Sequence, residues 1–90
     1  MDLHKSVIKN KEELYSLAIE YYNKIDKEYL EEYFIVPRSI SIVIDHQFIP
    51  IPCVEIKLEL KHQNEQKHIG HYILYIDERK NFVDEFLIID

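Results

Sequence analysis

Three histidines near the middle of the chain are the first candidates for chemistry. His62 and His68 flank the polar segment 63–66, and His71 follows. If that segment is a turn between two strands, His62 and His68 can face each other, with Glu65 as a third metal ligand. His71 lies three residues after His68, a spacing that puts it on the opposite face of a strand. Because a good site needs three or four converging ligands, a polar hairpin end is favoured, and we predict no metal and no cofactor.

Cys53 is the second candidate, since a thiol beside His46 or His71 can act as a nucleophile. It is the one cysteine of the chain, so it cannot form a disulfide within it, which suits the cytoplasm. A lone cysteine usually packs as a small hydrophobic side chain. Gly70 is the one glycine, which leaves little for an oxyanion loop. We therefore predict that the protein is not an enzyme.

The charge of the chain indicates the kind of partner it can bind. The 90 residues carry 17 Asp and Glu against 11 Lys and Arg, a net charge of -6. Such a chain repels phosphate backbones and anionic lipids, so we predict no nucleic-acid and no membrane binding. It attracts basic proteins. Most of the acids fall in two segments, residues 12–34 and 77–90.

Tyrosines lie among the acids of the first segment. They are Tyr15, Tyr21, Tyr22, Tyr29 and Tyr33. One helical stripe buries about three of them, and tyrosine is enriched at protein interfaces. The alternative is that these rings line the rim of a small core.

The first half of the chain is predicted to be a helix over residues 10–35. Asn10 is a good N-cap, with Glu13 at the capping-box spacing. Pro37 disfavours a helical residue before it and ends the helix near Phe34. The apolar positions follow steps of three and four residues: Leu14, Leu17, Ala18, Tyr21, Tyr22, Ile25, Tyr29 and Tyr33.

The second half changes to a period of two and predicts four strands. They cover residues 39–45, 54–61, 68–77 and 82–89, with turns at 63–66 and 78–81. Segment 48–52 contains two prolines and is a loop or an edge. Short polar turns favour hairpins. We expect a single α+β domain over residues 1–90, with one N-terminal helix packed on a four-stranded antiparallel meander. The sheet either wraps the helix, as in a cystatin-like arrangement, or curves little.

The last residues, 70–90, combine a strand, an acidic turn (Asp77-Glu78-Arg79-Lys80-Asn81) and a strand. This pattern resembles the closing hairpin of several small bacterial immunity proteins of contact-dependent and polymorphic toxin systems. The resemblance implies a small acidic protein that binds and blocks a toxin domain, often a basic nuclease. It carries over no functional residue, because such families share no catalytic motif.

The function that these features predict is a non-enzymatic inhibitor or immunity-type protein that occludes a basic protein. Carboxylates steer the encounter, and aromatic anchors hold the complex. The predicted partner-binding residues are Glu28, Tyr29, Glu31, Glu32, Tyr33, Asp77, Glu78, Asp84 and Glu85.

Two alternatives stay open. The first is a small-molecule-binding or enzymatic domain, with a pocket between helix and sheet that contains His46, His71 or tyrosines. The second is a homo-oligomeric accessory subunit, such as a homodimer, that pairs through an exposed strand at 39–44 or 82–89.

Overall fold

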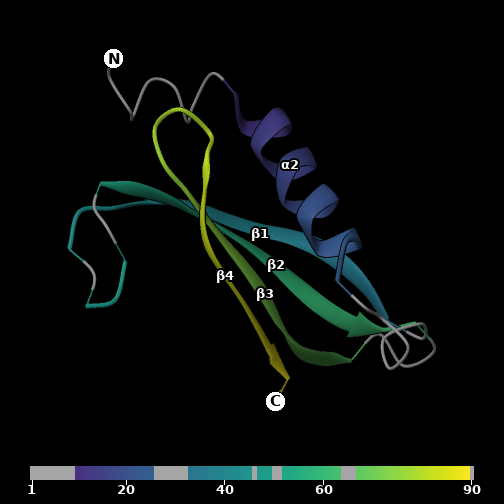
Figure 1. Ribbon diagram of the computed structural model, residues 1–90. Helices are drawn as coiled ribbons and strands as arrows, with labels where there is room; N and C mark the ends of the chain where they lie inside the picture. The colour runs from purple at the N-terminus through teal and green to yellow at the C-terminus, as the bar shows by residue number, and fades with distance from the viewer. Residues whose placement is uncertain (1–9, 26–32, 46, 50–51, 64–66, 90) are drawn as a thin grey trace.

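The computed structural model describes residues 10–25, 33–45, 47–49, 52–63 and 67–89, and it contains one helix and one sheet (Figure 1). The elements are α2 (Lys11–Asn23), β1 (Tyr33–Val43), β2 (Cys53–His62), β3 (His68–Ile76) and β4 (Phe82–Ile89). The strands lie in the order β1-β2-β3-β4, and all neighbours are antiparallel. The predicted α+β class and the meander are confirmed.

Helix α2 packs on one face of the sheet through an apolar stripe with a helical spacing. Leu14, Ala18 and Tyr22 are buried, each four residues from the next. They contact the side chains of β2 and β3 that point to the same side, namely Val54, Ile56, Leu58, Leu60, Tyr72, Leu74 and Ile76. Burying each large apolar side chain stabilises the fold by about 1.5–3 kcal/mol. We call the opposite side of the sheet the open face.

The helix is shorter than the sequence predicts. It ends at Asn23, and the N–H groups of Lys24 and Ile25 bond to carbonyls three residues back in a final tight turn. Residue Tyr33 begins a strand instead of continuing the helix. Residues 33–36 are aromatic and β-branched, and pairing with β2 overrides their helical spacing.

Pro37 lies inside β1 rather than between helix and strand. An edge strand tolerates a proline because one of its sides makes no ladder bonds. The register with β2 shifts between Pro37 and Ser39, which leaves Arg38 as the extra residue of a bulge.

The predicted capping box at the start of α2 does not form. The Asn10 carbonyl accepts the N–H of Leu14 at 2.9 Å, but no side chain caps the helix. Instead the Glu13 carboxylate accepts a bond from Nζ of Lys80 at 2.5 Å. This ion pair ties the first turn of the helix to the turn between β3 and β4.

A second, smaller core lies on the open face. Ile49, Cys53 and Tyr75 are buried together, with Val43, Ile73 and Val83 packed around them. Residues 47–49 thus cover one end of this face.

Among the residues that the structure describes, no helix combines the length and the hydrophobicity needed to cross a lipid bilayer.

Candidate protein-binding edge

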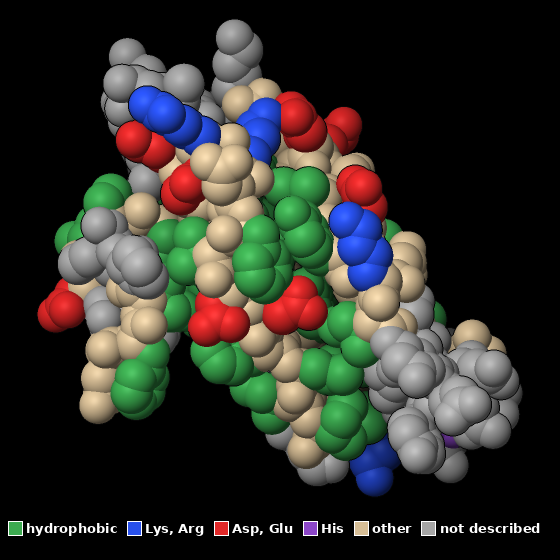
Figure 2. All heavy atoms as spheres, viewed as in Figure 1, with side chains coloured by type: hydrophobic (Ala, Val, Ile, Leu, Met, Phe, Trp, Pro, Cys, Tyr) green, Lys and Arg blue, Asp and Glu red, His purple; other side chains and the backbone are tan. Residues whose placement is uncertain are grey.

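The C-terminal strand leaves a row of apolar side chains exposed. Phe86, Leu87, Ile88 and Ile89 are 38%, 36%, 45% and 50% exposed. In the described part of the chain, β3 pairs with one side of β4 and no strand pairs with the other. Figure 2 shows hydrophobic side chains gathered along the middle of the molecular face on which β4 lies, with acidic side chains among them. We call residues 84–89 the β4 edge.

Both faces of the β4 edge carry the same pattern, an acid followed by apolar residues. Glu85 and Leu87 lie opposite Leu74 and Tyr72, so their side chains point to the helix side. The residues that alternate with them point to the open face. Asp84 is opposite Tyr75, Phe86 is opposite Ile73, and Ile88 is opposite His71. Any partner that covers this edge must therefore satisfy one carboxylate on each face.

The backbone groups of the β4 edge alternate between β3 and the unpaired side. The carbonyl oxygen of Ile88 points toward β3, where it lies 2.0 Å from the place that a Cβ on Gly70 would occupy. Phe86 and Ile88 therefore turn their N–H and C=O groups toward β3. Glu85, Leu87 and Ile89 turn theirs outward, where Leu87 and Ile89 offer both donors and acceptors, whereas the N–H of Glu85 is bonded to the Asp84 carboxylate.

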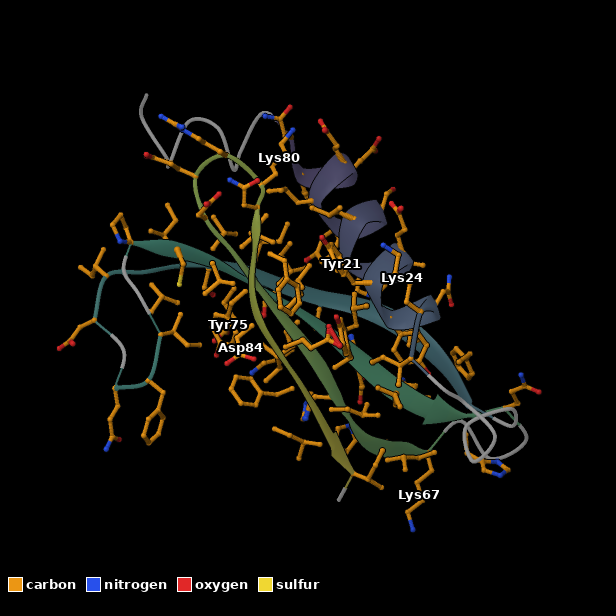
Figure 3. All side chains as sticks on the ribbon, in the orientation of Figure 1. Tyr21, Lys24, Lys67, Tyr75, Lys80 and Asp84 are labelled. Atoms are coloured by element: carbon orange, nitrogen blue, oxygen red, sulfur yellow. The ribbon has the colours of Figure 1, made fainter. Side chains whose placement is uncertain are left out.

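The two acids of the β4 edge are half-buried. The Glu85 carboxylate accepts the hydroxyl of Tyr72 at 3.3 Å, and the Asp84 carboxylate accepts the N–H of Glu85 at 2.8 Å. Burial, with Glu85 beside it, raises the pKa of Tyr72 well above its ordinary value, so this hydroxyl stays a donor. Figure 3 shows Asp84 close to Tyr75, near the middle of the molecule. Tyr75 is also held, by a 2.8 Å bond from its hydroxyl to Glu55.

The other acids predicted on this hairpin are placed differently. The Asp77 carboxylate accepts the N–H groups of Arg79 and Asn81 at 2.8 and 2.9 Å, and the Asn81 side-chain amide at 3.1 Å. These bonds, the Asn81 backbone first, lower the pKa of Asp77 below its usual value. Asp77 thus holds the turn, whereas Glu78 is exposed at its tip.

The remaining predicted partner-binding residues fall elsewhere. Glu28, Tyr29, Glu31 and Glu32 lie outside the described residues. The backbone of Tyr33 belongs to β1, so its prediction as a helix residue is wrong. Of the described sites, only Asp84 and Glu85 lie on one surface with exposed apolar side chains.

The histidines form a different cluster from the one that the sequence predicts. The register between β2 and β3 shifts near Leu60, and His68 lies opposite Lys61 instead of His62. The shift also brings His68 and His71 together, with ring centroids 4.7 Å apart. Their predicted placement on opposite faces is wrong because a bulge reverses the alternation.

A buried carboxylate connects this histidine cluster to β1. The Oε1 atom of Glu59 accepts a hydrogen bond from the Nε–H group of Arg38 at 2.5 Å, and Oε2 lies 2.6 Å from Nδ1 of His68. These bonds, His68 first, hold the pKa of Glu59 below its usual value. Within the described ranges, no group of three His, Cys, Asp or Glu residues is arranged to hold a metal ion, and Glu65 falls outside those ranges.

The fold places His71 away from Cys53 and away from the space between helix and sheet, where the alternative ligand pocket would lie. The Cys53 side chain is fully buried, and burial raises the pKa of its thiol, with Glu55 adding to the effect. His71 lies opposite Glu59, well along β2 from Cys53, on the face away from the helix. His46 lies outside the described residues. Between helix and sheet, the space is packed with aliphatic side chains and the rings of Tyr22 and Tyr72.

Comparison of the chain with protein-family models, with curated proteins and with solved structures finds no match.

Proposed function

We propose that this chain is a non-enzymatic inhibitor, of the immunity type, that binds a basic protein and occludes its working surface. A toxin nuclease domain is the kind of partner that fits. The observation that carries the proposal is the β4 edge, where two half-buried carboxylates adjoin four exposed apolar side chains on an unpaired strand.

Each part of this surface has a physical role in binding. Exposed Phe86, Leu87, Ile88 and Ile89 release water when covered, and residues of this kind supply most of the residence time of a complex. Asp84 and Glu85, in a chain of net charge -6, raise the association rate with a cationic partner. A reduced, buried Cys53 suits a protein that works in the cytoplasm.

The test compares two double charge reversals that change the net charge equally. The partner is first captured on the immobilised chain at low and at moderate salt, identified by mass spectrometry, and purified. Association rates are then measured for Asp84→Lys with Glu85→Lys, and for Glu12→Lys with Glu20→Lys, which alters exposed acids of α2. We expect the β4 variant to associate at least about tenfold more slowly, equivalent to about 1.4 kcal/mol, and the α2 variant to change far less. Equal effects of the two variants would contradict the assignment to the β4 edge.

The second candidate function is a homo-oligomeric accessory subunit that pairs through β4, which the same unpaired strand favours. A mass from light scattering that stays at 11.0 kDa across concentrations would remove it.

A further inference from the structure

We propose that the basic partner binds by adding a strand to β4. The added strand runs antiparallel to β4, sets an apolar stretch opposite Phe86, Leu87, Ile88 and Ile89, and sets two consecutive cationic residues opposite Asp84 and Glu85. The inference rests on the proposed function for the nature of the partner, and adds how that partner is held.

The backbone supports strand addition rather than side-chain contact alone. Leu87 and Ile89 turn their N–H and C=O groups away from β3, and Glu85 adds an outward C=O, since its N–H is bonded to Asp84. Strand β4 contains no proline, lysine or glycine to block pairing. Main-chain bonds of this kind supply affinity when an extended segment joins a sheet edge. The other edge strand, β1, carries Pro37 and a bulge, so it is a poor template.

The side chains determine what the added strand must contain. Asp84 and Glu85 are consecutive and point to opposite faces. Two consecutive cationic residues on the added strand would place one cation beside each carboxylate, and opposite charges stabilise cross-strand pairs. Beyond the acids, both faces are apolar along residues 86–89. In the antiparallel direction, the partner segment therefore has its apolar stretch first and its basic pair last.

Charge also favours a basic strand over a second copy of this chain. If two β4 strands paired symmetrically about Leu87, each Glu85 would lie opposite an Ile89 and neither acid would meet a cation. Each copy would also bring a net charge of -6. A basic strand neutralises both carboxylates while covering the same apolar side chains.

The first measurement titrates the full chain with a short end-blocked peptide in which Val, Ile and Tyr precede two Lys residues. Binding is followed by amide hydrogen exchange and amide NMR shifts. We expect the outward N–H groups of Leu87 and Ile89 to gain protection. The inward N–H groups of Phe86 and Ile88, already bonded to β3, should change little. A peptide of the same composition with the Lys pair first should bind at least about tenfold more weakly.

The matched variants are Leu87→Ala and Leu87→Pro. Both remove the leucine side chain, but only proline also removes the outward N–H. We expect the proline variant to bind the peptide at least about tenfold more weakly than the alanine variant. If the proline variant does not fold, peptides N-methylated on alternate residues provide the same test on the unaltered chain. Methylation of one alternating set should then abolish binding, and methylation of the other set should not.

The outcomes separate this inference from the proposed function. Equal binding by Leu87→Ala and Leu87→Pro, together with loss of binding in Glu85→Lys, would overturn strand addition and leave a basic-protein surface standing. Protection of Leu87 and Ile89 that rises with protein concentration alone would show that a second copy occupies the edge, which overturns the inference. If the peptide binds as expected but no basic partner responds to charge reversal at Asp84 and Glu85, the proposed function fails and strand addition stands.

Discussion

The two edges of the sheet, β1 and β4, differ in the features that control pairing with another chain. β1 contains Pro37, a bulge at Arg38 and a run in which Ser39 and Ser41 alternate with isoleucine. Arg38 is folded back onto Glu59. β4 has no proline, its one bulge is at Val83, before residues 84–89, and its last four residues are apolar and exposed.

Proteins usually protect edge strands with proline, bulges or inward charges, because unpaired strands associate. The β1 edge follows this rule, and β4 departs from it. A partner that covers the apolar residues of β4, as we propose, would account for this unprotected strand. The difference between the edges supports that proposal.

The largest expected change in stability comes from a substitution that displaces β4 from β3. A Cβ at Gly70 would lie 2.0 Å from the Ile88 carbonyl oxygen, so Gly70→Ala must displace the end of β4. We expect a loss of about 3 kcal/mol in the free energy of unfolding, measured with urea. Ser41→Ala on the exposed β1 edge is the control and should change it by less than about 0.5 kcal/mol. Similar values for the two variants would mean that β4 does not approach Gly70 closely.

A smaller effect is expected from the bond that holds Glu85 in place. Tyr72→Phe removes the hydroxyl donor to that carboxylate and should cost about 1 kcal/mol in unfolding free energy. In a double-mutant cycle with Glu85→Ala, the coupling between the two sites should account for most of this loss. Additive effects would show that the two side chains do not interact.

The contribution of Glu59, which holds Arg38 of the β1 bulge, can be tested by measuring stability at two pH values. Because its bonds to His68 and Arg38 lower the pKa of Glu59 in the folded state, this group stabilises the fold above its unfolded pKa of about 4.3. That contribution is lost as pH falls through the lower folded pKa. We expect Glu59→Gln to reduce the urea midpoint at pH 7 and to differ less from the parent at pH 3. A difference that stays constant with pH would refute the role of the charged carboxylate.

The smallest expected effect concerns the turn that leads into β4. Lys80 has a φ of 66°, which glycine adopts more easily than lysine. Lys80→Gly should therefore stabilise the fold, by about 0.5 kcal/mol after loss of the exposed ion pair with Glu13. In a Glu13→Gln background, where no ion pair is lost, the gain should be larger, and thermal unfolding can measure both.

The sequence predicts the hairpin of β3 and β4 best and the start of β1 worst. Residues 82–89 alternate poorly, but the polar segment 78–81 fixes where β4 begins. Residues 33–36 satisfied a helical spacing as well as a strand composition, and only their pairing with β2 decided between the two. In the sequence alone Pro37 predicts a helix stop, because its place on an edge strand depends on the sheet order.

The candidate site was predictable in part. Charge alone predicts Asp84 and Glu85 as binding residues, whereas strand 82–89 is expected to be an exposed edge only in the homo-oligomer alternative. Whether Leu87 and Ile89 are exposed depends on β4 lying at the edge of the sheet, where α2 reaches its first residue, Phe82, through Tyr21. No local pattern shows this. The bond of Arg38 to Glu59 spans 21 residues of sequence and depends on a bulge at each strand pair, so spacing could not reveal it either.

The central claim is that β4 is an open edge whose backbone is available for pairing. The most direct test is amide hydrogen exchange of the free chain at low concentration. We predict alternation along residues 86–89, with fast exchange at Leu87 and Ile89 and slow exchange at Phe86 and Ile88. Uniformly slow exchange at all four amides would contradict this, because the outer side of β4 would then already be paired.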